Sequence, residues 1–354
     1  MSKQYHDEIS DIYNDKLKAL LKTLPDYCKY YFNAKAQSFE PRTGYAYAVD
    51  MRTFYEFIIS TKPSYQGKSI KDVPISLFDE LTSHDIDEYL NYLKKYSFEG
   101  DHRKNSESGR KRKFIALRSF CKYYLEKGYI KKNPTELMPT PKVHKDDTIS
   151  YLTKEEKEQL FFAIKSSYGM TPWQETLNAY CRKRDIAILM LLLGTGIRVS
   201  ELVGLNIEDI DFKENVVHII RKGGNAGHVY FNEQVKDAIL SYLRPSIVPV
   251  GTRDGLGAPP EERALFISLK KKRLSVRSVQ KIIEKYKTLA FGPEITKKIS
   301  PHTMRKTYGT ELYLEKNDIK LVSDTLGHKS ITTTQQYYAS TTEEKRKTAA
   351  IKVL

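Results

Sequence analysis

Apolar residues in the first 140 positions recur every three or four residues, a spacing that places them on one face of a helix. This pattern predicts helices over 1–39, interrupted at Pro25, and over 43–59, 83–96 and 103–129. Ser83 is the expected N-cap of the third of these helices, because its hydroxyl can accept a hydrogen bond from a free amide of the first turn. The pattern is typical of an all-α domain.

A polar, proline-punctuated stretch follows these helices, with Asn133-Pro134, Pro139 and Pro141 before KVHKDDT. Such a composition is typical of a linker between domains. Because 354 residues exceed an ordinary single core, we predict two domains. Their expected bounds are 1–140 for the N-terminal domain, 141–149 for the linker and 150–354 for the second domain.

The second domain has a mixed pattern that is still mostly helical. Thr153 and Glu156 have the spacing of a capping box and predict a helix start. The run from Arg184 to Leu193 is apolar on all sides, which predicts a buried helix. Short β-rich runs at 216–220 and 228–231 flank the glycine-rich RKGGNAG and are the only sheet signal, which predicts a hairpin. The expected fold class is therefore mainly α with one small antiparallel β-sheet.

Charge points to the kind of partner. The net charge is +15, from 59 Lys and Arg against 44 Asp and Glu, which favours a polyanion. Part of this charge lies at the start of the fourth predicted helix, as Arg110, Lys111, Arg112 and Lys113. We interpret this run as a DNA-binding surface for phosphates, with steep salt dependence and little sequence choice. A solvated charged face explains the run by itself equally well.

Cysteine content and hydropathy bear on the location. The three cysteines, Cys28, Cys121 and Cys181, cannot form a paired disulfide framework and lack metal-ligand spacing. No signal peptide is visible at Met1, and the longest apolar run is far shorter than the roughly 20 residues that span a bilayer. We expect a cytoplasmic protein with no membrane partner.

Candidate chemistry is concentrated near the carboxyl end. His302 and Arg305 stand three apart at a helix start, with Ser300 as N-cap and Pro301 in the first turn, so both side chains can leave one face. A guanidinium matches phosphate oxygens in a bidentate way, and a histidine can move protons near neutral pH. A lone His-x-x-Arg is, however, most often a solvated helix face.

Two further residues follow the next helix stop. His328 comes directly after the pair Leu326-Gly327, and Tyr337 lies nine residues further on. A tyrosine hydroxyl is a possible covalent nucleophile. Taken alone, Tyr337 is more simply a packing residue, because the chain contains 25 tyrosines.

Two more cations precede this region. Arg198 follows the turn Gly194-Thr195-Gly196 at the end of the buried helix, and Glu201 stands one helical step further, where it can hold the arginine or form a local surface ion pair. Lys222 lies at the tip of the predicted hairpin, as a proton donor or as a simple turn lysine. The glycines around it do not match a P-loop, so nucleotide hydrolysis is not indicated.

The motifs GTGIRVSELVGL, the hairpin lysine, HTMR and LGHKSITTTQQYY occur in the order and approximate spacing of the tyrosine recombinase (phage integrase) family, which the chain resembles from about 149 to 339. The first domain is more faintly similar, from 43 to 142. The last motif and FIALRSFCKYYLEKGYIKKNP look most like the Xer branch, and the length and long N-terminal lead resemble its single-recombinase XerH type.

The resemblance implies a SAM-like core-binding N-terminal domain, a catalytic second domain and a role for each candidate. The implied catalytic residues are Arg198, Lys222, His302, Arg305, His328 and the nucleophile Tyr337, with Glu201 in support. Tyr338 is the neighbouring alternative to Tyr337. Lys306 stands where the family often has a histidine. The implied reaction cuts and rejoins DNA through a 3′-phosphotyrosyl link, with no cofactor, no metal and no ATP.

The same resemblance implies partners. These are double-stranded DNA with a dif-type site, a homotetramer joined by C-terminal segments such as 341–354, and a division-linked translocase of the FtsK type. Chromosome dimer resolution is the expected role. A mobile-element integrase with the same chemistry is one alternative, and a catalytically idle DNA-binding protein is another. The segment 247–263 has no assigned role.

Overall fold

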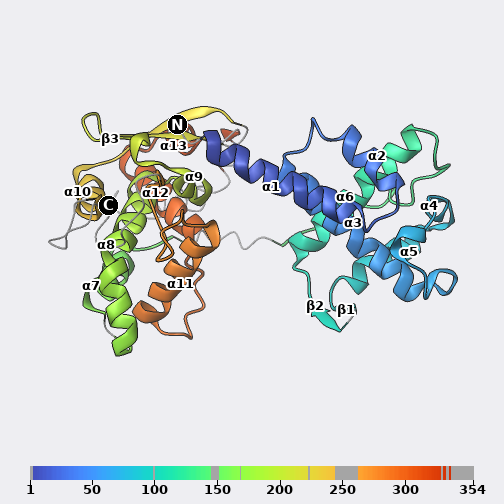
Figure 1. Ribbon diagram of the computed structural model, residues 1–354, viewed down its shortest axis with the longest axis horizontal. Coiled ribbons are helices and arrows are strands. Elements are labelled where there is room, and N and C mark those ends of the chain that lie inside the picture. The colour runs from blue at the N-terminus through green and yellow to red at the C-terminus, as the bar shows by residue number, and fades with distance from the viewer. Residues whose placement is uncertain are drawn as a thin grey trace, which may run out of the picture. The chain divides into compact units, whose positions relative to one another are not determined.

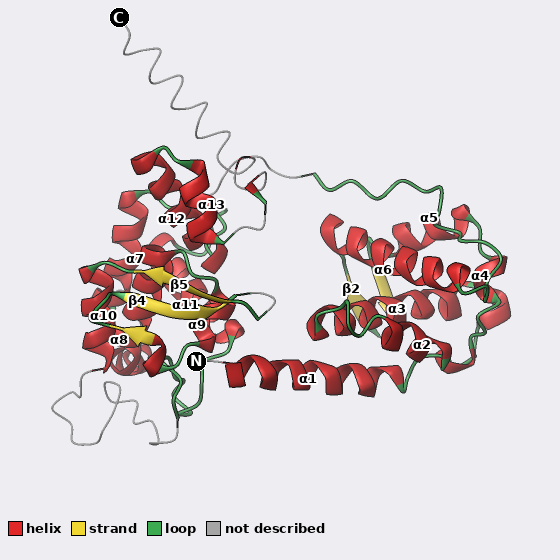
Figure 2. Cartoon of the chain, turned by 90° about the horizontal axis from the view of Figure 1, so that it is seen from above, coloured by secondary structure: helices red, strands yellow, loops and turns green. Residues whose placement is uncertain are grey.

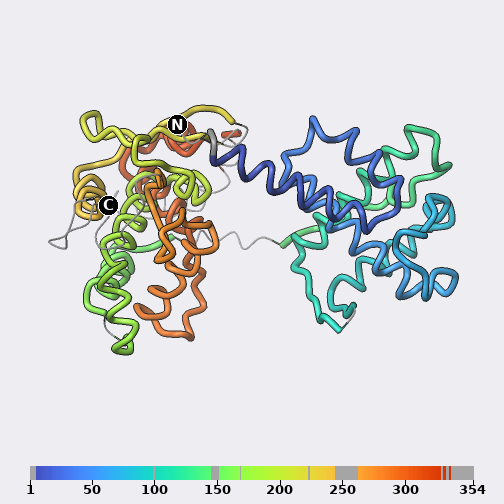
Figure 3. The backbone as a smooth tube through the Cα atoms, in the orientation of Figure 1, coloured from blue at the N-terminus to red at the C-terminus, as the bar shows by residue number. Residues whose placement is uncertain are grey.

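The computed structural model describes residues 3–98, 100–144, 151–167, 169–221, 224–243, 262–327, 330, 331 and 335. The chain forms two compact units. The first comprises Asp7–Lys145, and the second joins Asp146–Leu354 to the first six residues. The two units are drawn in Figure 1, and the path of the chain can be followed from blue to red in Figure 3.

The first unit is built mainly of helices. They are α1 (Lys3–Leu21), which belongs to this unit from Asp7 onward, α2 (Tyr27–Ala34), α3 (Pro41–Thr61), α4 (Leu77–Glu80), α5 (Ser83–Tyr92) and α6 (Glu107–Glu126), with short 3-10 turns at Pro63–Tyr65 and Ile70–Asp72. The helix predicted over 83–96 begins at Ser83 as expected, but its predicted N-cap and its end are wrong. Thr82, not Ser83, is the N-cap of α5, and it forms a capping box with Asp85. The helix also stops at Tyr92, well short of position 96.

A small hairpin follows α5 that the sequence pattern did not predict. Strand β1 (Tyr96–Phe98) pairs antiparallel with β2 (Asp101–Arg103). Three-residue strands are too short to show a clear alternation of apolar and polar residues. The sequence pattern therefore predicts only the β-hairpin of the second domain. The first unit is therefore helical apart from this hairpin.

Aromatic rings fill the core of the first unit. Tyr31 is fully buried and meets Phe120 edge to face, with ring centroids 5.0 Å apart. Phe54 meets Tyr89 in the same way at 5.2 Å. Buried tyrosine hydroxyls need partners, and that of Tyr31 donates to Ser119 at 2.8 Å. Many of the 25 tyrosines are thus packing residues.

The second unit surrounds the long helix α8 (Pro172–Thr195). Its other elements are α7 (Lys154–Ser166), α9 (Val199–Gly204), a 3-10 turn (Ile207–Asp209), β3 (Ile210–Asp211), β4 (Val216–Ile220), β5 (Ala226–Tyr230), α10 (Glu233–Leu243), α11 (Val276–Phe291), α12 (Pro301–Lys316) and α13 (Ile319–Leu326). The mainly helical fold with small antiparallel sheets confirms the predicted class.

Local signals in this unit are confirmed. Thr153 and Glu156 form the predicted capping box at the start of α7. Ile188 and Leu192 are fully buried within the predicted apolar stretch, although α8 begins twelve residues earlier than that stretch. Strands β3, β4 and β5 form an antiparallel sheet in which Val217 lies opposite Val229. Figure 2 shows β4 and β5 side by side in this sheet.

The start of the predicted buried helix carries charge rather than an apolar side chain. Arg184 donates to Asp185 and to the carbonyl of Ile267, and Tyr286 on α11 donates to Asp185 at 2.8 Å. These contacts satisfy buried charges that would otherwise be costly. In the part of the chain that the structure describes, no helix is long and apolar enough to cross a membrane.

Candidate active site

Arg198 occupies the turn between α8 and α9. Helix α8 ends at Gly196, whose φ of 62° is left-handed and whose missing Cβ leaves room for the rings and methyls of α12 and α13. The backbone amide and Nη1 of Arg198 both donate to Glu201, at 2.9 and 2.8 Å. Glu201 is 4% exposed, so the pair is largely removed from water. Glu201 therefore fixes the arginine both through its backbone and through its side chain.

Arg305 lies on the second turn of α12, in the helix that the sequence predicted. Ser300 caps α12 by accepting from the amide of Thr303, and Pro301 takes the first helical position. The guanidinium of Arg305 is 6% exposed. Its Nη1 donates to the carbonyl of Gly196 at 2.6 Å, and its Nη2 donates to the carbonyl of Leu326. One buried arginine thus joins the end of α8 to the end of α13.

Three arginines from separate parts of the chain meet at the end of α13. Nη2 of Arg198 donates to the carbonyl of Gly327 at 2.9 Å, beside the contact of Arg305 with Leu326. Nη2 of Arg221 lies 3.4 Å from the carbonyl of Thr325. The last carbonyls of a helix have no partner within it and carry its partial negative charge. Cations are therefore drawn to this turn without any carboxylate.

His302 stands in a strongly positive environment. Its pKa is lowered from the usual value, first by desolvation among neighbouring protein atoms and then by Lys306, Arg305, Lys298 and Arg198. The residue as a whole is nevertheless exposed. A histidine surrounded by cations stays neutral at neutral pH, and a neutral imidazole can accept a proton.

Lys306 adds to the same cluster. This half-buried lysine follows Arg305 and stands four residues after His302 on α12. Its pKa is lowered by burial and, to a smaller extent, by Lys298. The chain thus has a cation beside its histidine where the family often has a second imidazole.

The remaining predicted catalytic residues cannot be placed. Lys222, His328, Tyr337 and the alternative Tyr338 lie outside the described residues, as do most of 247–263 and the C-terminal segment 341–354. The structure nevertheless describes the residues directly before two of them, Arg221 and Gly327. Of the predicted set it brings together Arg198, Glu201, His302 and Arg305.

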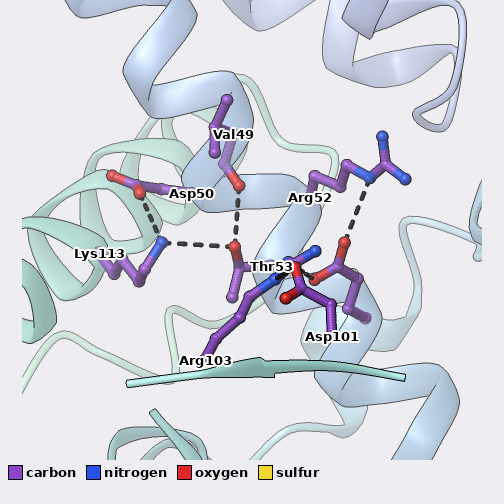
Figure 4. A network of polar contacts seen from close by, with 8 residues as sticks. Val49, Asp50, Arg52, Thr53, Asp101, Arg103 and Lys113 are labelled. Atoms are coloured by element: carbon purple, nitrogen blue, oxygen red, sulfur yellow. Dashed lines mark hydrogen bonds and ion pairs between the residues drawn. The ribbon is translucent and has the colours of Figure 1, made fainter. Parts of the chain in front are cut away.

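The four cations of the basic run 110–113 differ in how deeply they are buried. Lys113 is 5% exposed, and its Nζ donates to Asp50 at 2.8 Å and to Thr53. Figure 4 shows this ammonium between the two side chains of α3. Arg112 also donates to Asp50, although about half of its side chain is exposed. Arg110 and Lys111 are half-buried. Lys113 is thus a core residue, and the surface cations are the other three.

The sequence did not point to Arg221 or Lys298. It also did not show that carbonyls at the end of α13 accept hydrogen bonds from arginine side chains. The hairpin pattern drew attention to Lys222 and not to its neighbour. No periodicity marks Arg221, because its partner Thr325 is 104 residues away. Lys298 precedes the N-cap of α12 and has no motif of its own.

Comparison with known proteins identifies the family of the chain. Residues 151–344 match the model of the phage integrase family, and residues 23–143 match that of the phage integrase SAM-like domain. The chain belongs to the phage integrase family. The expected enzyme class, a tyrosine site-specific recombinase that transfers DNA strands, is thereby confirmed.

Relatives of this integrase-family chain include several Xer proteins. It is 34% identical to the tyrosine recombinase XerC of Caldanaerobacter subterraneus subsp. tengcongensis over 318 residues, which cover 88% of this chain and 80% of the relative. It is 27% identical to the tyrosine recombinase XerS of Lactococcus lactis subsp. cremoris, covering 89% and 91%. The predicted Xer branch is thus confirmed.

Solved structures show the same fold. A post-cleavage complex of XerH with a palindromic difH substrate matches with a TM-score of 0.62 and 19% identity, covering 90% of this chain and 82% of that one. A lambda integrase dimer bound to a COC′ core site matches with a TM-score of 0.61 and 17% identity, covering 88% and 93%. At this identity the likeness concerns the fold.

Proposed function

We propose that this recombinase cuts and rejoins DNA with Tyr337 as nucleophile, through a 3′-phosphotyrosyl intermediate. The observation that carries the proposal is the pair Arg198 and Arg305. They come from helices far apart in sequence, yet both donate to consecutive carbonyls, Gly327 and Leu326, directly before His328. Two guanidinium groups held side by side suit the non-bridging oxygens of one phosphate.

The proton balance assigns the other roles. The Tyr337 hydroxyl attacks the phosphorus, the new P–O(Tyr) bond forms and the P–O5′ bond breaks. His302, whose pKa is lowered by desolvation and by the surrounding cations, accepts or orients the phenolic proton. Lys222 gives a proton to the departing 5′ oxygen, and His328 donates to a non-bridging oxygen. In rejoining, the 5′ hydroxyl attacks and the same protons return.

DNA and further copies of the chain complete the proposal. Arg110, Lys111 and Arg112 supply phosphate contacts from the first unit, in keeping with a net charge of +15. Two duplexes need four protomers, so we propose a homotetramer joined by 341–354, at a dif-type site on the cytoplasmic nucleoid. The similarity to Xer recombinases favours chromosome dimer resolution as the role, and a mobile-element integrase has the same chemistry. We propose a translocase of the FtsK type as a further partner in dimer resolution.

A nicked suicide substrate tests the chemistry. Once the strand is cut, the short fragment that carries the free 5′ hydroxyl diffuses away. The covalent protein–DNA adduct then accumulates because the strand cannot be rejoined. We expect the adduct with the natural chain and its loss in Tyr337→Phe. Tyr338→Phe is the matched control, because it removes the neighbouring hydroxyl and should keep the adduct. DNA binding without any adduct in the natural chain would support the idle DNA-binding protein instead.

The sites bound in cells separate the two biological roles. We expect chromatin immunoprecipitation with Tyr337→Phe, which binds without cutting, to give one dominant site near the replication terminus. Sites scattered at element junctions would contradict dimer resolution and support the integrase.

A further inference from the structure

Arg221 is the first residue after β4 and closes the turn of the hairpin. Its backbone amide donates to the carbonyl of Asn225 at 2.8 Å, and its carbonyl accepts from the amide of Gly224 at 3.1 Å. Its side chain leaves the hairpin and approaches the carbonyl of Thr325 on α13. A single residue thus belongs to the hairpin by its backbone and to the end of α13 by its guanidinium.

Two glycines make room for this side chain. A Cβ at Gly327 would lie 1.4 Å from Nη1 of Arg221, and a Cβ at Gly227 on β5 would lie 2.7 Å from its Nε. Neither distance is possible, so any larger residue at either position displaces the arginine. Gly327 also needs its left-handed φ of 61° to end α13, whereas the φ of Gly227 is one that other residues adopt. Glycine at position 227 is therefore required to leave space for the Arg221 side chain and not to allow a special backbone conformation.

Electrostatic attraction also favours the position of the Arg221 guanidinium at the end of α13. The end of α13 carries the partial negative charge of the helix, and Arg198 and Arg305 already donate to its last two carbonyls. Among the described residues, Arg221 has no carboxylate within ion-pair distance, and its side-chain hydrogen bond is with the carbonyl of Thr325 at the helix end. The hairpin is thereby attached to the turn that holds both phosphate-binding arginines.

We propose that Arg221 is a positioning residue that sets where Lys222 presents its proton. This inference rests on the proposed function, in which Lys222 protonates the departing 5′ oxygen. Consecutive Cα atoms are about 3.8 Å apart, so holding Arg221 limits the positions open to the residue after it. A misplacement of about 1 Å can cost on the order of a hundredfold in rate, so this attachment matters to proton transfer.

The test compares two leaving groups. In one suicide substrate the scissile phosphate has its natural 5′ oxygen, and in the other this oxygen is replaced by sulfur. A thiolate leaves without being protonated, so the sulfur substrate no longer needs Lys222. We expect Arg221→Ala to slow adduct formation about tenfold with oxygen and less than about twofold with sulfur, because only the proton donor is displaced.

Two reference variants calibrate the comparison. Cleavage by Lys222→Ala should also be restored with the sulfur substrate. Arg198→Ala should cleave both substrates slowly, because Arg198 stabilises the negative charge on the non-bridging phosphate oxygens and not the leaving group. Adding Arg221→Ala to Lys222→Ala should slow cleavage no further, since residues that act as a unit are not additive. Equal loss on both substrates, or additive loss in the double variant, would overturn the inference.

Gly227→Ala provides a second perturbation that keeps the arginine and its charge. Its added methyl meets Nε of Arg221, so it should displace the guanidinium and reproduce the oxygen-specific loss. In an Arg221→Ala background the same change should have little further effect. Unchanged thermal unfolding of these variants excludes loss of the fold, and unchanged DNA affinity excludes a direct phosphate contact of Arg221.

The outcomes separate this inference from the proposed function. If the natural chain forms no adduct with either substrate, the proposed function fails. If it forms the adduct and the Arg221→Ala and Gly227→Ala variants cleave the oxygen substrate as fast as the natural chain, only the inference about Arg221 fails.

Discussion

The buried cations of the first unit and the arginines of the candidate active site are held in different ways. In the first unit Lys113 and Arg112 donate to Asp50, and Arg52 and Arg103 donate to Glu56. Figure 4 shows Lys113, Asp50, Arg52 and Arg103 of this network. Asp50 and Glu56 are each 1% exposed, and desolvation raises the pKa of both while the cations lower it. The first network is therefore made of opposite charges that neutralise each other within the fold.

At the candidate active site of the second unit the arginines are held mainly by neutral groups, whereas Arg184, elsewhere in this unit, pairs with the buried Asp185. Arg305 donates to the carbonyls of Gly196 and Leu326, and Arg198 donates to Gly327 as well as to Glu201. Carbonyls orient a guanidinium without cancelling its charge. The difference teaches that a buried cation neutralised by a carboxylate supports the fold, whereas one held by backbone carbonyls keeps its charge for an anionic substrate.

The largest effect should come from breaking the neutralised network. Lys113→Met leaves Asp50 buried with Arg112 as its remaining cation, and breaking a buried pair costs about 3–5 kcal/mol. Urea unfolding at pH 7 should show this loss. Because burial raises the pKa of Asp50, protonation in the folded state should reduce the loss as the pH falls. Lys111→Met, the same change two residues earlier, should alter stability far less.

Removing an arginine that is held by backbone carbonyls should slow DNA cleavage and leave DNA affinity nearly unchanged. Arg305→Ala should slow adduct formation by about 10²–10³, or about 2.7–4 kcal/mol, the usual cost of one charge-stabilising donor. DNA affinity, measured by fluorescence anisotropy, should change little, and Arg198→Ala should behave alike. Arg263→Ala, which removes a carboxylate-paired arginine of the same unit, should cleave at the natural rate. A parallel loss of affinity and cleavage in Arg305→Ala would contradict the comparison.

Glu201 tests the one carboxylate in the arginine cluster. Glu201→Ala removes two hydrogen bonds to Arg198 and should slow adduct formation about tenfold, since a hydrogen bond to a charged group contributes about 1.5–3 kcal/mol. Glu201→Gln keeps an acceptor oxygen and should lose less. If both variants cleave at the natural rate, Glu201 does not hold Arg198 for catalysis.

The smallest effect concerns pH. The pKa of His302 is lowered in the folded state, so the folded chain binds fewer protons than the unfolded chain just below the usual histidine value of about 6.5. Stability should therefore fall as the pH drops through this range. His302→Gln should show a weaker fall in thermal unfolding between pH 7 and 5. Identical pH profiles of the two chains would refute the shift.

Local signals in the sequence were sufficient where the interacting groups are close along the chain. Thr153 with Glu156, and Ser300 with Pro301, define helix starts within four residues, and Gly327 ends α13 as predicted. The order of motifs likewise gave the family and the candidate residues. The predicted cap at Ser83 failed by one position, because Thr82 has Asp85 three residues further on and forms a capping box with it.

By itself, then, the sequence determined several helix starts and ends, the mainly α class and the identities of the candidate residues, because each depends on spacing or on a motif. Only the tertiary structure decided how the cations are used. It turned Lys113 inward to Asp50, 63 residues away, and brought Arg305 to Gly196 across 109 residues and Arg221 to Thr325 across 104. The physical reason is that a carbonyl is present in every residue, so no sequence pattern reveals which one an arginine will bind.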